Sequence, residues 1–474
     1  MSNERNEQEV VEAILGRRID RRDFLRLTGY AGTAAGVAAF IAACQPAASA
    51  APSASKAPTV SAAPSATVTP SASTAITGRP IKIGYVSPKT GPFSAFGEAD
   101  DYAVGTINTA LAGGLDVGGT LHPVQIITKD SQSDPNRAAE VAGSLILDDG
   151  VDLILVSSTP ETTNPVTSQA EANHVPAIST ITPWQPYFFG RQPPGTAPAD
   201  AKPFDWTYHF FWGLEDVIAV FTDMWNQVPT NKVVGGLFPN DGDGQAWSAN
   251  FPDALKAAGY TINVPPLYET GSKDYSAQIS AFKKAGAEVL TGVPIPPDFT
   301  TFWTQAQQQG FTPKVASMGK ALLFPASVDA LGPTAGDGLS SEVWWSPSHP
   351  FTSSLTGETA KALADAYTSA TGKQWTQPLG FAHAIFEVAT DALKRCGNVD
   401  DKAAIRDAIK ATALDTVVGK VDWTKNTPVP NVAKTPLVGG QWGKGTAFNY
   451  DLVIVSNKDH PEIPAGGKMR PIGG

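Results

Sequence analysis

Two stretches rich in hydroxyl groups, residues 157–163 and 179–184, are the parts of this chain best suited to hold a small molecule. Each follows a strand-like run and leads toward a helical pattern. Hydroxyls beside a helix start can donate hydrogen bonds to an anion, and the free amides of the helix add partial positive charge. The same hydroxyls could instead only cap the helices, so both interpretations stay open. The candidate ligand-binding hydroxyls are Ser158, Thr159, Thr162, Thr180 and Thr182.

The motifs that catalysis would need are absent from the sequence. It contains no Gly-x-Ser-x-Gly, His-Glu-x-x-His, Walker or dinucleotide-binding glycine motif, and its six histidines are scattered. His383 and Glu387 are one helical turn apart and could share a metal, but a lone pair of this kind is more often structural. We therefore predict that the protein is not an enzyme and has no catalytic residue, cofactor or metal site.

Strand and helix patterns alternate around these stretches. Asp134 and Pro135 form a good helix start, because aspartate can cap free amides and proline fits the first helical turn. The order strand, helix, strand is typical of a parallel sheet. The first series has strands at 81–86, 124–128 and 151–156 and helices at 98–111 and 135–147.

A second series of the same kind begins at residue 232. Because the body after residue 79 has about 395 residues, which is large for one core, we predict an α/β fold with two similar lobes. The second series has strands at 232–238, 261–264, 288–293 and 314–317 and helices at 248–258 and 276–285.

The N-terminal stretch has the layout of a targeting segment. Arg21 and Arg22 precede a weakly apolar run, 27–43, that ends in small residues before Cys44. The pair resembles a twin-arginine export signal and the run resembles a lipobox, in which the cysteine becomes a lipid-modified first residue. The sequence predicts a signal peptide at 1–43, a lipid anchor at Cys44 and an Ala/Pro/Ser/Thr-rich disordered tether at 44–78. The alternative is an uncleaved N-terminal membrane helix, and both place the body outside the cytoplasm.

The net charge argues against nucleic acid as a partner, and the cysteine content argues against a disulfide. Removing residues 1–43 takes away six basic and six acidic residues, so the net charge stays at −10 and nucleic acid is a poor partner. With Cys44 used for lipid, Cys396 has no partner; we predict no intramolecular disulfide and a buried, unreactive Cys396. No other stretch is long and apolar enough to be a membrane span.

Four segments carry a resemblance to a known family: 81–92 followed by Gly97-Glu98, 107–114, 129–135 with 149–152, and 274–279. Through them, the chain from 81 to about 461 resembles the extracytoplasmic solute receptors of branched-chain amino acid-type ABC importers, the leucine/isoleucine/valine-binding protein family.

The resemblance implies a type I periplasmic binding fold. Two Rossmann-like lobes with parallel-type central sheets would be joined by three crossovers near residues 206, 340 and 436. Lobe 1 would contain 79–206 and 341–436, and lobe 2 would contain 207–340 and 437–474. The ligand would be trapped as the lobes close, and the closed form would dock on a permease with ATPase subunits. A sensory lipoprotein and an extracellular hydrolase are the alternatives.

Three positions depart from the family pattern. Pro160 and Pro183 stand about where ligand-binding hydroxyl residues are usual, and Lys320 stands where many relatives carry an acidic residue for an ammonium. Lys320 would favour an anion, whereas Asp243 could pair with a cation, so the charge of the ligand stays open. The loop at 240–245 does not fit an EF-hand, which needs Gly at its sixth position and Glu at its twelfth. Counted from Asp241, these positions are Ala246 and Pro252.

Aromatic residues complete the candidate site. Phe93, Ser94 and Phe96 look like the family's first ligand-covering loop, although Phe96 could pack under the next helix. A cleft walled by aromatic side chains would suit a flat or apolar solute. The ligand classes considered are amino acids, amides and aromatic or aliphatic carboxylates. The tryptophans expected in or beside the cleft, each of which could instead be core, are Trp184, Trp212 and Trp247.

Overall fold

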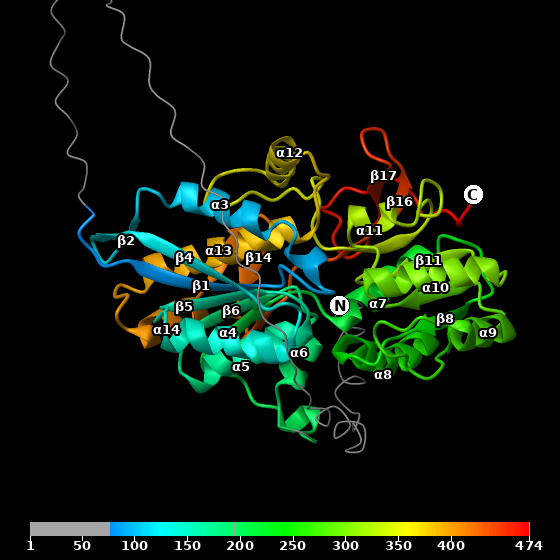
Figure 1. The fold of residues 1–474 in the computed structure, drawn as a ribbon, viewed down its shortest axis with the longest axis horizontal. Helices are drawn as coiled ribbons and strands as arrows, with labels where there is room; N and C mark the ends of the chain where they lie inside the picture. Colours follow the sequence, from blue (N-terminus) through cyan, green and yellow to red (C-terminus); the bar gives the residue numbers. More distant parts are fainter. Residues whose placement is uncertain (1–75, 194, 474) are drawn as a thin grey trace, which may run out of the picture. The chain divides into compact units, whose positions relative to one another are not determined.

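The computed structural model describes residues 76–193 and 195–473, and these form two main β-sheets flanked by helices (Figure 1). The predicted signal peptide, its Arg21 and Arg22, the lipid-modified Cys44 and nearly all of the tether lie outside the described residues. Thr77 and Gly78, the end of the predicted tether, belong to the folded body, because both amides donate to the Leu121 carbonyl.

The first sheet is entirely parallel. Its central strands are mostly apolar and almost wholly buried, because a parallel sheet covered by helices buries both faces; Leu153–Ser157, for example, is buried throughout. Its spatial order is β4 (Val124–Asp130), β1 (Ile81–Ser87), β5 (Leu153–Ser157), β6 (Ala177–Thr180), β7 (Thr207–Phe210) and β15 (Val432–Ala433).

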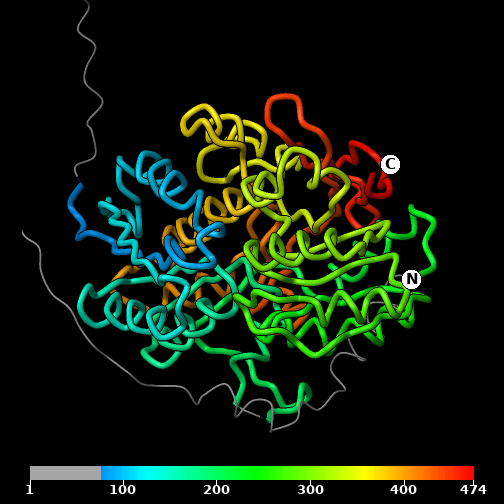
Figure 2. Tube along the Cα trace, turned by 45° about the vertical axis from the view of Figure 1, so that its right-hand side comes forward, coloured from blue at the N-terminus to red at the C-terminus, as the bar shows by residue number. Residues whose placement is uncertain are grey.

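Helices from distant parts of the chain cover the first sheet. The long helix α13, which is almost wholly buried, packs against α3, β5 and β6. Figure 2 shows this orange C-terminal segment among the blue and cyan N-terminal elements. The helices of this lobe are α3 (Asp100–Ala110), α4 (Pro135–Leu147), α5 (Pro160–Ala172), α6 (Trp184–Gly190), α12 (Ala360–Thr371), α13 (Pro378–Arg395) and α14 (Lys402–Lys410).

The second sheet is parallel except for two strands at one edge, β16 and β17. Its order is β9 (Thr261–Asn263), β8 (Val233–Leu237), β10 (Val289–Gly292), β11 (Val315–Met318), β12 (Ser340–Val343), β16 (Val438–Lys444) and β17 (Tyr450–Ser456). Its helices are α7 (Leu214–Trp225), α8 (Gly242–Ala257), α9 (Ser276–Ala285), α10 (Pro296–Gln308) and α11 (Pro325–Asp329).

Short elements complete the fold. Two hairpins pair β2 (Leu115–Val117) with β3 (Thr120–His122) and β13 (Ala413–Thr416) with β14 (Gly419–Asp422). The 3-10 helices are η1 (Ser94–Gly97) and η2 (Pro198–Asp200).

The chain passes between the two sheets three times, and two of the three passages begin a few residues after the expected points. Strand β7 pairs with β6 in the first sheet, so the chain leaves that sheet after Phe210 rather than near 206. Strand β12 pairs with β11 and β16, so the return follows Val343 rather than 340. The third passage lies between β15 and β16. In both shifted cases, backbone pairing holds a strand in its sheet a few residues longer than the sequence pattern indicates.

Helix starts follow the capping residues. Helix α4 begins at the predicted Pro135, and Asp134 accepts a hydrogen bond from the Arg137 amide at 2.8 Å. Helix α8 begins six residues before the predicted 248, because Asp241 accepts from the Gly244 amide at 2.7 Å and so caps an earlier start. None of the helices in the described range is long and apolar enough to cross a membrane.

Candidate functional site

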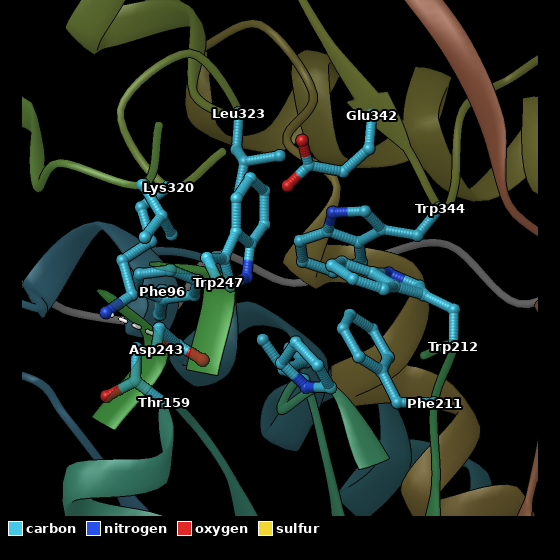
Figure 3. A pocket seen from close by; sticks show the side chains of 13 residues that line it. Phe96, Thr159, Phe211, Trp212, Asp243, Trp247, Lys320, Leu323, Glu342 and Trp344 are labelled. Atoms are coloured by element: carbon cyan, nitrogen blue, oxygen red, sulfur yellow. Dashed lines mark ion pairs between the residues drawn. The ribbon is translucent and has the colours of Figure 1, made fainter. Parts of the chain in front are cut away.

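A small cavity lies where the two sheets face each other, at the carboxyl ends of their strands (Figure 3). Its volume is about 20 Å³, enough for about one water molecule. Ligands of open α/β sheets bind at this edge, where loops rather than helices cover the strand ends. The lining residues are Phe96, Thr159, Ile181, Pro183, Phe211, Trp212, Asp243, Trp247, Val293, Lys320, Leu323, Glu342 and Trp344.

Each wall comes from a defined group of elements. Phe96 follows β1, Thr159 follows β5, and the 181–183 and 211–212 pairs follow β6 and β7. From the second sheet, α8 carries Asp243 and Trp247, the loops after β10 and β11 carry three more residues, and Glu342 lies within β12. Both lobes therefore contribute side chains to one space.

Aromatic rings make the walls stiff. Phe211 packs against Trp212 with ring centroids 4.9 Å apart and edge-on against Trp344 at 5.2 Å. On the opposite side, Trp247 stacks on Phe251 at 4.6 Å. Such ring pairs fix one another's orientation and present flat apolar surface to the cavity.

Several buried polar atoms of the lining have no hydrogen-bond partner among the described residues. They are the indole Nε1 atoms of Trp212, Trp247 and Trp344, the Thr159 Oγ1 and the Asp243 Oδ1. Folded proteins pair the great majority of such atoms, and each exception destabilises the fold. Five such atoms around one cavity are groups with which a molecule in the cavity can form hydrogen bonds.

Lys320 is buried between two carboxylates. Its Nζ lies 3.1 Å from Asp241 and 2.8 Å from Asp243. Although burial lowers it, the two carboxylates raise the pKa of Lys320 above its ordinary value, so the ammonium stays charged. Burial raises the pKa of Asp243 to about 7, against the opposing effect of Lys320. The lysine charge is therefore already balanced inside the protein.

Glu342 is a second buried acid in the wall. It is 2% exposed, and burial raises its pKa to about 8. The Ser341 hydroxyl donates to its Oε2 at 3.1 Å, and no basic side chain within the described ranges forms an ion pair with it. Near neutral pH the group is largely a protonated carboxyl.

Two lining residues have left-handed backbone conformations. Ile181 has φ 66° and Lys320 has φ 47°. A β-branched residue in this region is rare, and such strain costs roughly 1–3 kcal/mol per residue. Strain of this kind is often found at binding and catalytic sites, and two of the eight non-glycine residues with positive φ in the described part of the chain lie in this cavity wall.

Six of the residues expected from the sequence come together around the cavity: Phe96, Thr159, Trp212, Asp243, Trp247 and Lys320. Phe93 and Ser94 do not line it. Phe93 lies beneath Lys320, whose Nζ is 5.8 Å from its ring centroid, and Ser94 is exposed.

The other first-lobe hydroxyls do not reach the cavity, contrary to expectation, because they bond within the lobe. Thr180 Oγ1 donates to the Phe210 carbonyl at 2.6 Å. Thr182 Oγ1 donates to the Ser158 carbonyl, and Thr162 Oγ1 donates to the Ser158 hydroxyl, both at 2.7 Å. These groups hold the loops of the first lobe in place.

Trp184, also expected in the cleft, is instead buried in a separate apolar cluster with Tyr187, Phe188 and Val432. Its indole Nε1 donates to Glu215 at 3.0 Å. A tryptophan with a satisfied indole and a full apolar neighbourhood packs the lobe and is not open to a ligand.

Sequence reasoning did not select Ile181, Phe211, Val293, Leu323, Glu342 or Trp344 as ligand contacts, and it listed Pro183 only as a departure from the family. One signal was present for Glu342: it is the only charged residue in the run 339–345, an otherwise apolar and hydroxyl-bearing strand. A lone acid in a buried strand is unusual and points to a special role.

A larger groove, of about 430 Å³, lies between residues of the first lobe alone, among them Phe204, Tyr208, Arg406 and Trp423. Arg406 is paired with Asp407 at 2.7 Å, and the second lobe contributes nothing to the groove. We favour the smaller cavity as the site because five unpartnered polar atoms and two residues with a left-handed backbone lie in its wall.

The remaining candidates have structural roles. His383 Nε2 lies 2.8 Å from the Ser353 hydroxyl, and Glu387 accepts from the Ser354 and Val417 amides. Within residues 76–193 and 195–473 there is no group of three or more side chains that could hold a metal ion. Cys396 is a free, half-buried thiol that contacts the Leu393 carbonyl.

Comparisons with known proteins agree with this geometry. The periplasmic binding protein family matches residues 80–446. The Leu/Ile/Val-binding protein homolog 3 of Brucella melitensis is 23% identical over 370 residues, which cover 73% of this chain and 87% of that protein.

Solved structures show the same two-lobed fold. A leucine-binding protein of Thermotoga maritima superposes with a TM-score of 0.66 at 20% identity, covering 80% of this chain and 99% of that one. A solute-binding protein of an ABC transporter from Rhodopseudomonas palustris, in complex with 3,4-dihydroxybenzoic acid, gives 0.62 at 17% identity, covering 80% and 96%. The fold and the resemblance inferred from the sequence are confirmed.

Proposed function

Because the chain belongs to the periplasmic binding protein family, we propose that it is the receptor of an ABC importer, which captures a small organic solute between its lobes and delivers it to a permease with ATPase subunits. The family consists of extracytoplasmic binding proteins, so the chain is not an enzyme, as its sequence predicted. One observation carries the proposal: a cavity lined by both lobes gathers five buried polar atoms without partners.

Closure of the lobes supplies the capture step. Across the cleft, the Gly242 amide of α8 donates to Glu161 of α5 at 3.2 Å, and Phe96 packs edge-on against Phe324 at 4.9 Å. A space of about 20 Å³ admits no organic solute, so the lobes part to admit one. Hinge motion around a bound ligand is the usual movement of such two-lobed proteins.

We propose that the receptor is held at the cell surface, or on the periplasmic face, by a lipid on Cys44. The support is the order of Arg21-Arg22, the apolar run and Cys44 in the sequence. Mass spectrometry of the protein extracted from membranes is expected to find Cys44 as the first residue, with a diacylglycerol on its sulfur. An unmodified chain that still carries residues before Cys44 would indicate an N-terminal helix anchor instead.

The receptor function is tested by a thermal-shift screen of the purified full chain, followed by recovery of the solute. The panel contains amino acids, amides, carboxylates and amines, and a small-molecule extract of the growth medium. A solute that binds only the folded state raises the midpoint by mass action. Recovery of that solute unchanged supports the receptor, whereas its chemical conversion would overturn it.

A further inference from the structure

We infer that the solute is a small organic cation, a protonated amine or a quaternary ammonium, held by the Glu342 carboxylate against the indole faces of Trp212, Trp247 and Trp344. The inference rests on the proposed receptor function and names the class of its solute. Four steps lead to it.

Most candidate donors of the first lobe are used within the lobe, and among its candidate hydroxyls Thr159 is the one that lines the cavity without a partner in the described part of the chain. Pro160, the first residue of α5, has no amide hydrogen. The first amide of α6, that of Trp184, already donates to the Trp212 carbonyl at 3.1 Å. The Thr180 and Thr182 hydroxyls donate to backbone carbonyls, so neither is available to bind an anion.

The second lobe offers no unbalanced positive charge. The buried Lys320 ammonium has two carboxylates in contact, Asp241 and Asp243. Glu161 of α5 approaches the same group and has an Oε2 atom that is buried without a partner. With Glu342, four carboxyl groups accompany one ammonium, so this region offers an anion no unbalanced positive charge.

Glu342 is the acid whose own charge is unmatched. It is 2% exposed in the cavity wall, and no basic side chain pairs with it within the described part of the chain. In Figure 3 its carboxyl group points toward the same space as the Trp247 and Trp344 rings. Because a buried carboxylate without a counter-ion is costly, the group keeps its proton near neutral pH. A cationic solute would supply the counter-ion with which Glu342 ionises.

The aromatic walls suit a cation as well. The face of an indole attracts a positive charge, with an energy of about 0.5–2 kcal/mol per contact. Trp212, Trp247 and Trp344 all line the cavity, and Phe211 packs against two of them. Their unpartnered indole N–H groups would donate to an oxygen of the solute, such as a hydroxyl or carbonyl.

The experiment uses matched pairs of probes that differ in charge and little in shape. Choline is compared with its neutral analogue 3,3-dimethylbutan-1-ol, and benzyltrimethylammonium with neopentylbenzene. Leucine and 3,4-dihydroxybenzoate serve as the zwitterionic and anionic arms. Each is titrated into the purified full chain by calorimetry and by thermal shift. We expect at least one cation to bind at least ten times more tightly than its neutral analogue.

Variants locate the effect. Glu342→Gln keeps the size and loses the charge, and it is expected to weaken cation binding at least tenfold. Glu387→Gln, which changes an equally buried glutamate outside the cavity, is the matched control and should bind as the wild type does. If Glu342→Gln does not fold, Trp212→Leu is used instead and should weaken the cation at least threefold without strengthening its neutral analogue.

Three results would overturn the inference. Equal affinity for a cation and its neutral analogue would make the site simply apolar. Binding of leucine or 3,4-dihydroxybenzoate without the cations would refute the solute class but leave the receptor function standing. If none of the probes binds, the inferred solute class is also refuted. The receptor function is then judged by whether an unchanged solute is recovered from the extract.

Discussion

Two charge clusters, each of one lysine and two acidic residues, differ in their surroundings. The hinge cluster consists of Lys434, Glu215 and Asp216, and the cleft cluster consists of Lys320, Asp241 and Asp243. In each, one ammonium lies within hydrogen-bonding distance of two carboxylates: 3.0 and 2.6 Å in the hinge cluster, 3.1 and 2.8 Å in the cleft cluster. The difference lies in what surrounds the carboxylates.

The hinge cluster is completed by the protein itself. Glu215 accepts hydrogen bonds from the Trp184 indole and the Gln185 amide, and Asp216 accepts from the Gly213 amide. Lys434 follows β15, so the cluster ties α7 to the third passage between the sheets. A fully paired cluster of this kind specifies structure.

The cleft cluster is left incomplete. The Oδ1 of Asp243 and the Oε2 of Glu161 are buried without hydrogen-bond partners, as are three indole hydrogens nearby. The comparison teaches that charge and burial alone do not mark a binding site; here the distinguishing feature is a set of unpaired polar atoms around a cavity that both lobes line.

The largest effect is expected when the complete cluster loses its cation. Lys434→Met leaves two buried carboxylates without a counter-ion and should lower the free energy of unfolding by about 3–5 kcal/mol, measured by urea denaturation. The control is the ion pair between the exposed Lys373 and Glu98. Lys373→Met should change the free energy of unfolding by less than about 1 kcal/mol. A loss below 1 kcal/mol in Lys434→Met would end the distinction between the clusters.

A pH-dependent effect is expected at Glu342, whose pKa rises from its ordinary 4.5 to about 8 on folding because it is buried. Below pH 4.5 both states are protonated. Between pH 4.5 and 8 the unfolded state ionises while the folded state keeps its proton, so stability falls as pH rises. The charged and polar neighbours that act on it are Asp243 and Ser341.

Glu342→Gln removes this loss. Between pH 5 and pH 8 the wild type should lose up to about 4 kcal/mol of stability through this group, at about 1.4 kcal/mol per pH unit, and the variant should not. Denaturation at several pH values measures it. Parallel curves for the two proteins would show that Glu342 titrates normally.

The smallest effect separates two tryptophans. Trp184→Phe removes a hydrogen bond to a buried carboxylate, whereas Trp212→Phe removes an indole hydrogen that has no partner. With equal loss of ring volume, Trp184→Phe should be less stable by about 1–2 kcal/mol. Calorimetric unfolding of both variants gives the difference, and equal stabilities would mean that the Trp184 bond contributes nothing.

The fold could be predicted well because its signals are local. Apolar runs gave the strands, and Asp134-Pro135 gave the start of α4 to the residue. Helix α8 was expected at 248 because its first turn, with three glycine or aspartate residues, reads as a loop until the Asp241 cap is seen.

The site was harder to predict because its residues are defined by partners that are distant in the sequence. Trp184 and Trp212 look alike in the chain, and only Glu215, which contacts one of them, separates their roles. Glu342 comes from β12, a strand whose side chains face the cavity only when the two sheets meet. The unpaired state of an atom cannot be read from a sequence.

The most direct test of the account is a crystal structure of the protein with the solute that most raises its unfolding midpoint. The account predicts that the solute lies between the lobes and contacts Glu342 and the rings of Trp212, Trp247 and Trp344. A solute bound instead in the first-lobe groove beside Phe204, with the cavity between the sheets unchanged, would contradict it.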